Sequence, residues 1–408
     1  MTQLTDLAPS IAGSPAETSA ELIQRARDLK PLLRQNAAVA DRNREVPREN
    51  VDAMVSSGVL KVWVPRRYGG YELDMTTQME ILAALAEGCS STAWVASMAI
   101  SSTFSMSCFP LQAQEEVWGT GPDTLFCGIL NPSGTAREVP GGYRISGEFP
   151  YASGNAHSEW AQLTIPLKFA DGRPVHIGYC LVPRSELGLK DTWYTVGMRG
   201  TGSNTLVADD LFVPEHRILP MLDAHGQMGP SSLSPFAAQE PLYQVPFGSL
   251  ASLWVIGVPL GIARTALEFA LDQVPRRSIA YSAYVEQRQA ATTQVALANA
   301  ASKIDAAHLL VRRATADADR VIYHRETPDL ITRGRIRQDC GFATDLVREA
   351  VDDIVKVCGA SSAADVNPLS RVFRDLATAS LHALLRPSLA AETYGRVLLG
   401  LDPMVSVI

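Results

Sequence analysis

The stretch NPLSRVFRDLATASLH, from Asn367 to His382, says the most about how this chain folds and works. It contains an Arg-Asp pair that ends at Asp375, and the residues after it read LATASLHA. Beyond Asp375, His382 is the only side chain here that exchanges a proton near neutral pH. We expect Asp375 to pair with a nearby arginine such as Arg371. The stretch predicts a late helix followed by a reactive histidine, although a helix histidine bonded to a backbone carbonyl fits the same pattern.

Outward from this helix, the character of the chain changes twice. Residues 19–122 show helical patterning, and residues 123–222 alternate short apolar stretches with turns, including a hairpin signal at Gly141-Gly142. Helical periodicity returns in residues 247–408. The order of helices, strands and helices predicts an α+β fold that is mostly α. Its parts are an N-terminal helical domain, a central β-barrel or sandwich, and a C-terminal four-helix bundle.

Two further segments do not fit these domains. Residues 1–18 are polar and rich in small side chains, which is typical of a disordered leader. Residues 223–246 are rich in Gly, Ser, Pro and Gln, so we expect a long connection that acts as a lid. The longest apolar run, Leu250 to Ala263, contains two glycines and a proline and is too short to span a bilayer. We therefore expect no membrane partner.

The composition excludes several functional classes. The 408 residues are 46% hydrophobic and 19% charged, as in an ordinary globular protein. A net charge of −7 without a basic block argues against nucleic acid as a partner. The six cysteines are scattered, so we expect a reducing cytoplasm and no metal site. No G-x-G-x-x-G opens a strand-to-helix turn, so no domain for a nicotinamide cofactor is expected.

Four stretches in chain order carry a resemblance to a known family. They are VPRRYGGYEL with GCSSTAWV (Val64–Leu73, Gly88–Val95), FPYASGNAHSEW (Phe149–Trp160), WYTVGMRGTGSNTLVADDLFVPEHR (Trp193–Arg217), and the late helix. Together they resemble the acyl-CoA dehydrogenase superfamily. The closer resemblance is to its two-component flavin-dependent monooxygenases, the branch of p-hydroxyphenylacetate and other phenol hydroxylases. Where the dehydrogenases carry a glutamate about two turns after the Arg-Asp pair, this chain reaches His382 instead.

The resemblance implies an acyl-CoA dehydrogenase-like fold and an oxygenase component. Such a component takes reduced flavin, FADH2 or FMNH2, from a separate NAD(P)H-dependent reductase. With O2 it forms a C4a-hydroperoxide that hydroxylates an aromatic or heteroaromatic small molecule. The family also implies a homotetramer, and the choice between FMN and FAD stays open.

The resemblance also assigns site residues. Ser153 is expected near flavin N5, or else as a turn cap; His382 is expected to orient or deprotonate a substrate hydroxyl; and His157 lies in the flavin-side loop. The expected cofactor-binding residues are Ala152, Gly154, Trp160, Asn131, Ser133, Thr201, Ser203, Arg276, Arg277 and Gly359. Which of the two adjacent arginines contacts flavin stays open.

Other functions remain compatible with the sequence. One is an acyl-CoA dehydrogenase or oxidase whose base has moved to Asp375 or Glu392; others are an N-oxygenase of an amino sugar and a catalytically silent scaffold. The related phenol hydroxylases carry a histidine on an earlier helix near their substrate. The corresponding region here, SMAISSTFSMSCF at residues 97–109, offers only serines, which argues against a simple phenolic acid as substrate.

Overall fold

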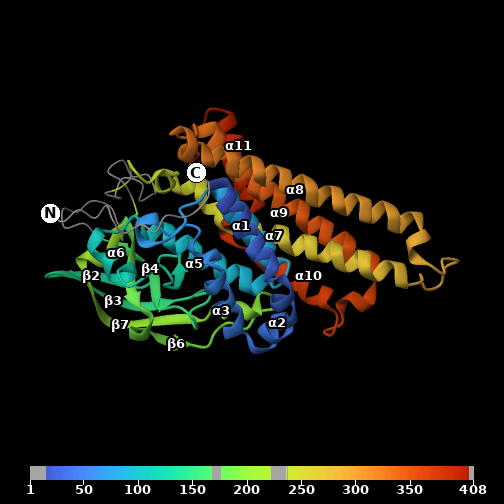
Figure 1. Cartoon of the computed structure of the whole chain (residues 1–408), viewed down its shortest axis with the longest axis horizontal. Coiled ribbons are helices and arrows are strands. Elements are labelled where there is room, and N and C mark those ends of the chain that lie inside the picture. The colour runs from blue at the N-terminus through green and yellow to red at the C-terminus, as the bar shows by residue number, and fades with distance from the viewer. Residues whose placement is uncertain (1–14, 168–175, 222–235, 237, 404–408) are drawn as a thin grey trace.

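The fold has three parts in the expected order, seen in a computed structural model that describes residues 15–167, 176–221, 236 and 238–403 (Figure 1). The N-terminal part consists of α1 (Pro15–Asp28), α2 (Lys30–Asn43), α3 (Arg48–Ser57), α4 (Met75–Ala86), α5 (Ser90–Met106) and α6 (Leu111–Trp118). Every residue of α5 is buried, so this helix lies in the middle of the molecule. The expected leader is wrong over residues 15–18, which already belong to α1; residues 1–14 lie outside the described residues.

The central part is built from two four-stranded sheets. The strands are β1 (Phe126–Ile129), β2 (Thr135–Val139), β3 (Gly142–Phe149), β4 (Trp160–Leu167), β5 (His176–Pro183), β6 (Gly188–Lys190), β7 (Thr205–Pro214) and β8 (Ile218–Pro220). One sheet has the order β1-β4-β5-β8 and the other β2-β3-β7-β6. The expected hairpin is confirmed, because Val139 pairs with Gly142 across a two-residue turn in which Gly141 has φ +81°. Apolar side chains of both sheets form one shared core.

The C-terminal part is a helical bundle. Its helices are α7 (Phe247–Gln273), α8 (Ala291–His324), α9 (Leu330–Cys358), α10 (Pro368–Ala379) and α11 (Pro387–Leu398). The long helices α7, α8 and α9 lie side by side, and α10 packs on α7 and α9 (Figure 1). Helix α7 with its short extension to Arg276 is long and apolar enough to cross a membrane, but most of its apolar stretch is buried inside the protein. It contacts α4, α5 and α9, and so acts as the core helix of the bundle.

Most of the expected lid, residues 222–235 and 237, lies outside the described residues. The rest of it is closely packed where it is described. A short 3-10 helix, Pro241–Gln244, carries Tyr243, which is fully buried and donates a hydrogen bond to the Trp63 carbonyl at 2.8 Å. The predicted fold class, a mostly α protein with helical, β and helical parts, is confirmed.

Candidate active site at the junction of α5, the β domain and α10

Three buried hydroxyl groups form a hydrogen-bonded chain that leads to the Met198 carbonyl. Thr201 donates to the Met198 carbonyl at 2.8 Å, and its oxygen lies 2.6 Å from Ser203 Oγ. Ser203 Oγ lies 2.6 Å from Ser153 Oγ. A hydroxyl carries one proton, so when Thr201 donates to Met198, Ser203 donates to Thr201 and Ser153 donates to Ser203. In this arrangement the Ser153 oxygen has lone pairs left to accept a further hydrogen bond.

The loop that carries Ser153 rests on helix α5. Ala152 N donates to the Asn204 carbonyl at 3.1 Å, and Gly154 N donates to the Thr201 carbonyl at 2.9 Å. Gly154 has φ +76°, and a Cβ atom there would lie 2.7 Å from the Val95 side chain. A glycine is needed because the backbone is left-handed and in contact with α5. The structure thus brings together Ala152, Ser153, Gly154, Thr201 and Ser203, and their contacts with flavin stay predictions.

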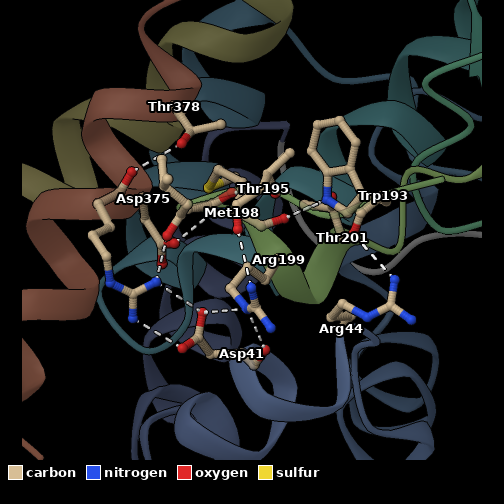
Figure 2. A network of polar contacts seen from close by, with 12 residues as sticks. Asp41, Arg44, Trp193, Thr195, Met198, Arg199, Thr201, Asp375 and Thr378 are labelled. Atoms are coloured by element: carbon tan, nitrogen blue, oxygen red, sulfur yellow. Dashed lines mark hydrogen bonds and ion pairs between the residues drawn. The ribbon is translucent and has the colours of Figure 1, made fainter. Parts of the chain in front are cut away.

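A polar network fixes the second loop of the site, residues 193–204 (Figure 2). Asp375 on α10 accepts from Met198 N at 2.6 Å and from Ser90 Oγ on α5 at 2.7 Å. Burial raises the pKa of Asp375 to about 6. Arg374 forms an ion pair with Asp41 at 2.9 Å. The expected pairing of Asp375 with Arg371 is wrong, because both carboxylate oxygens of Asp375 are aimed at the β-domain loop and at α5.

His382 follows α10 and faces helix α5 from the other side of the site. Its ring meets the Trp94 ring edge to face, with centroids 5.3 Å apart and planes at 72°. Its Nδ1 accepts from Leu384 N at 3.4 Å, which makes His382 the N-cap of a short 3-10 helix, Ala383–Leu385. Burial, and secondarily the positive charge of Arg337, lower the pKa of His382 to about 4. The imidazole is therefore neutral at pH 7.

Several expected site residues lie outside this junction. His157 is bound through Nε2 to the Val46 carbonyl at 2.7 Å, so its imidazole ties the loop to the α2–α3 connection. Trp160 begins β4 and stacks under the guanidinium of Arg217 at 5.1 Å. Asn131 and Ser133 lie in a turn near the surface and hydrogen-bond to each other. These contacts stabilise the β domain. The flavin contacts expected of His157, Trp160, Asn131 and Ser133 stay predictions.

A second group of expected residues lies at the far end of α10. Arg277 donates to the Cys358 carbonyl at 2.7 Å and to Ser361 Oγ, and so holds the turn that contains Gly359. Arg276 is largely exposed and pairs with Asp272 at 2.7 Å. The residues that line a pocket of about 470 Å³ there, called the distal pocket below, are Gln273, Arg276, Arg277, Ser361, Ala364, Val366, Asn367 and Pro368. Its two guanidinium groups suit an anion such as a phosphate.

The distal pocket and His382 are separated by the length of α10. This helix has 12 residues and therefore spans about 18 Å, with Pro368 at the pocket and His382 beyond the other end. The predicted residues thus fall into two separate groups, called the half-sites below. One contains hydroxyls and an imidazole, and the other contains guanidinium groups. Both fit a flavin: Ser153 offers an acceptor to a ring N–H, and the distal pocket offers cations to a phosphate.

The sequence reasoning missed three residues that build the junction. Trp94 supports His382, Ser90 holds Asp375, and Arg337 lies under the turn after His382. The first two lie in the GCSSTAWV stretch that carries part of the resemblance, but that stretch was assigned only to the N-terminal helices and not to the site. For Arg337 the sequence did contain a signal. The residue occupies a buried position on the same face of α9 as Cys340, Thr344 and Val347, where an apolar residue is normal.

Comparison with known families and structures agrees with this geometry. The family described as "Acyl-CoA dehydrogenase, N-terminal domain" matches residues 17–118, and "Acyl-CoA dehydrogenase, C-terminal domain" matches residues 253–387. A pigment production hydroxylase from Rhodococcus sp. is 34% identical over 395 residues, which cover 95% of this chain and 99% of the relative. The oxygenase component of a FADH2-dependent resorcinol hydroxylase from Rhizobium sp. is 31% identical over 404 residues, with 97% and 98% covered.

A solved structure shows the same architecture. XiaF from Streptomyces sp., in complex with FADH2 and glycerol, superposes with a TM-score of 0.89 at 36% identity and covers 97% of this chain and 98% of its own. The fold and the junction define a flavin-dependent monooxygenase built on a dehydrogenase scaffold. The chain belongs to the acyl-CoA dehydrogenase family, in its branch of two-component monooxygenase oxygenase subunits.

The predicted family, enzyme class and flavin cofactor are therefore confirmed. The alternative of a dehydrogenase with a moved base finds no support in the geometry. Asp375 uses its two carboxylate oxygens to hold Ser90 and Met198, and Glu392 is exposed on α11. The site residues stay predictions, now with a defined arrangement.

Proposed function

We propose that this protein inserts one oxygen atom of O2 into an aromatic or heteroaromatic small molecule, with Ser153 and His382 as its catalytic residues. The observation that supports the proposal is the hydroxyl chain from Ser153 to the Met198 carbonyl. It can make the Ser153 oxygen an acceptor next to α5, the helix that His382 contacts through Trp94. A reduced flavin ring carries an N–H at N5, and a fixed acceptor is the group that holds such a proton in place.

A bound reduced flavin supplies the two-electron activation of O2, with one oxygen atom going to the substrate and the other to water. The chain's own contribution is to exclude bulk water and aim a few hydrogen bonds. Ser153 and Ser203 are 4% and 3% exposed, so water has little access to the hydroxyl chain. His382 then positions the substrate hydroxyl or amine against the site, with Trp94 fixing its ring.

The cofactor is proposed to be FADH2 rather than FMNH2. The resorcinol hydroxylase component is FADH2-dependent by name, and XiaF holds FADH2. The distal pocket is compatible with this choice, since its two guanidinium groups suit the diphosphate of FADH2, which carries one phosphate more than FMNH2. Arg277 is the better candidate of the two arginines, because it is anchored to the Cys358–Ser361 turn, whereas Arg276 projects into solvent.

A complete site is proposed to need more than one subunit. The position of the two half-sites at opposite ends of α10 supports a site in which the distal pocket of one protomer serves the junction of another. We propose a homotetramer in the cytoplasm that receives FADH2 from a separate NAD(P)H-dependent reductase.

The serines of α5, which replace the histidine of the phenol hydroxylases, favour a substrate other than a simple phenolic acid.

The test is a product and peroxide balance. The protein is loaded with FADH2 or FMNH2 without oxygen, mixed with oxygenated buffer, and offered a panel of phenols, naphthols and indoles. The proposal expects one panel member to yield hydroxylated product with little hydrogen peroxide, and to do so best with FADH2. If every panel member is recovered unchanged while all of the oxygen appears as hydrogen peroxide, the proposal is wrong.

A further inference from the structure

A buried arginine lies under the turn that carries His382. Arg337 on α9 is 4% exposed and donates to Ser252 Oγ at 2.6 Å, to the Leu384 carbonyl at 2.7 Å and to the Ala383 carbonyl at 3.3 Å. Ser252 on α7 also donates to the Leu384 carbonyl, at 3.0 Å. Arg337 and Ser252 thus fix the short 3-10 helix after His382 to both long helices.

Arg337 is a cation without an acidic partner in the described part of the chain. No carboxylate lies within ion-pair distance of its guanidinium there, and its Nε has no hydrogen-bond partner. Burying an unpaired charge is strongly unfavourable, because the charge loses its hydration without gaining an ionic partner. This cost indicates that the charge serves the site rather than stability alone.

The fixed turn also determines the tautomer of His382. Leu384 N–H points at Nδ1, so in the neutral ring Nδ1 accepts and the proton is on Nε2. Leu384 is the same residue whose carbonyl Arg337 holds. A second proton on Nδ1 would break the contact with Leu384 N–H and face the positive charge of Arg337.

Other charges do not offset this effect. Helix α5 and the part of α7 before Arg264 contain no ionisable side chain. On α10, Asp375 is engaged with Ser90 and Met198, and Arg371 lies about three turns before His382. Arg386, after the short 3-10 helix, is exposed. Arg337 is therefore the charge that governs the ring.

We propose that Arg337 is a positioning residue of the oxygenase site, which holds His382 as a neutral imidazole that donates its Nε2–H and does not act as a base. The inference rests on the proposed function for its chemical meaning. It changes the expected role of His382: the ring gives a hydrogen bond to an electronegative atom of the substrate or of activated oxygen, and it does not remove the proton of a substrate hydroxyl.

The first test is independent of activity. The protein is labelled with 15N-histidine in a deuterated background, and the His382 signal among the seven histidines is identified by its loss in His382→Gln. We expect the wild-type ring to carry its proton on Nε2 and to remain neutral from pH 8 to pH 5. A proton on Nδ1, or a ring that titrates near pH 6.5, overturns the inference.

Variants of Arg337 test the cause. Arg337→Met should raise the pH at which His382 titrates and mix the two tautomers, whereas Arg348→Met, an exposed change on the same helix, should alter neither. An unchanged His382 signal in Arg337→Met overturns the role of Arg337. If Arg337→Met does not fold, Arg337→Lys replaces it: the charge is kept with fewer directed donors, so the ring should stay neutral but lose its single tautomer.

Substitution of His382 separates a donor from a base. Glutamine keeps an N–H donor without a base, and glutamate keeps a base without a donor. We expect His382→Gln to give at least about tenfold more product per flavin oxidised than His382→Glu. The reverse order shows that His382 is a base. If no flavin gives product in the wild type, the proposed function fails, while the ring signal still decides the role of Arg337.

Discussion

At the scale of the residue, the site depends on where single protons lie. Ser153 is an acceptor because Ser203 and Thr201 take up the protons of the chain, and His382 is neutral because desolvation and the positive charge of Arg337 disfavour its protonated form. Neighbouring residues impose the acceptor character of Ser153 and the neutral state of His382. One substitution can remove either property.

Ser153→Ala should uncouple oxygen use from product formation. The variant lacks the acceptor, so we expect about a hundredfold less product per flavin oxidised, the scale of removing one aimed hydrogen bond from an active site. Product and peroxide assays measure this ratio. Ser158→Ala is the matched control, since Ser158 lies in the same loop but its described hydrogen bonds are to the Asn155 carbonyl and the Cys127 thiol, outside the hydroxyl chain. Equal coupling in Ser153→Ala and the control would contradict the role of Ser153.

His382 should make the protein less stable in acid. The unfolded chain binds a proton at a histidine near pH 6.5, whereas folded His382 binds it only near pH 4. Between these values the unfolded state holds more protons, so the free energy of unfolding falls as the pH falls from 6.5 to 4. His382→Gln should remove up to roughly 3 kcal/mol of this acid loss. Asp375 acts in the opposite direction, because its raised pKa adds stability as the pH falls below about 6, but it is present in both proteins.

Chemical unfolding of both proteins between pH 8 and pH 4.5 measures the difference. Parallel stability curves for wild type and His382→Gln would show that the folded protein does not hold His382 neutral.

At the scale of the element, α5 is the part that brings the site together. Its first turns contact Asp375 through Ser90, His382 through Trp94 and the Ser153 loop through Val95. The β-domain loop of residues 193–204 is held at the site by its contacts with α10. Gly197 lies so close to α10 that a Cβ there would be 2.0 Å from the Arg374 carbonyl oxygen.

Gly197→Ala should therefore force the loop away from α10. We expect a loss of about 2 kcal/mol in the free energy of unfolding, as for other overpacked contacts, and weaker binding of reduced flavin, because Thr201 and Ser203 lie on the same loop. Gly395→Ala is the control: its added methyl meets open space on α11, so this variant should gain about 0.5 kcal/mol. Denaturation curves and flavin titration report both effects. A stable, flavin-binding Gly197→Ala protein would show that the contact between the loop and α10 is adjustable.

The sequence predicted the elements better than their contacts. Domain order and the hairpin at Gly141 followed from local patterns, and Ser153 and His382 followed from motifs that are contiguous in the chain. The partners of Asp375 did not, because Ser90 and Met198 lie 285 and 177 residues away in sequence. An arginine four residues earlier seemed the natural partner, yet the turn of α10 aims Asp375 elsewhere. Arg337 was missed for the same reason, because its role depends on its contacts with the turn that follows α10.

At the scale of the whole molecule, the separation of the half-sites predicts subunit complementation. His382→Ala keeps a working distal pocket, and Arg277→Ala keeps a working junction. Each variant alone should have little activity, but a mixed oligomer refolded from equal amounts should regain about a quarter of the sites, where both contributions are intact. Product assays before and after mixing test this. No gain on mixing, with mixed oligomers shown to form, would mean that each protomer holds its own complete site.

We expect this fold to hold reduced flavin so that oxygen reacts productively, and stopped-flow absorbance measures this reaction. Protein loaded with FADH2 or FMNH2 is mixed with oxygenated buffer, and the return of oxidised flavin is followed against free flavin. We expect a clear delay with FADH2, shortened in Ser153→Ala and unchanged in Ser158→Ala. Oxidised flavin that returns as fast as in free solution, with both flavins, would contradict it.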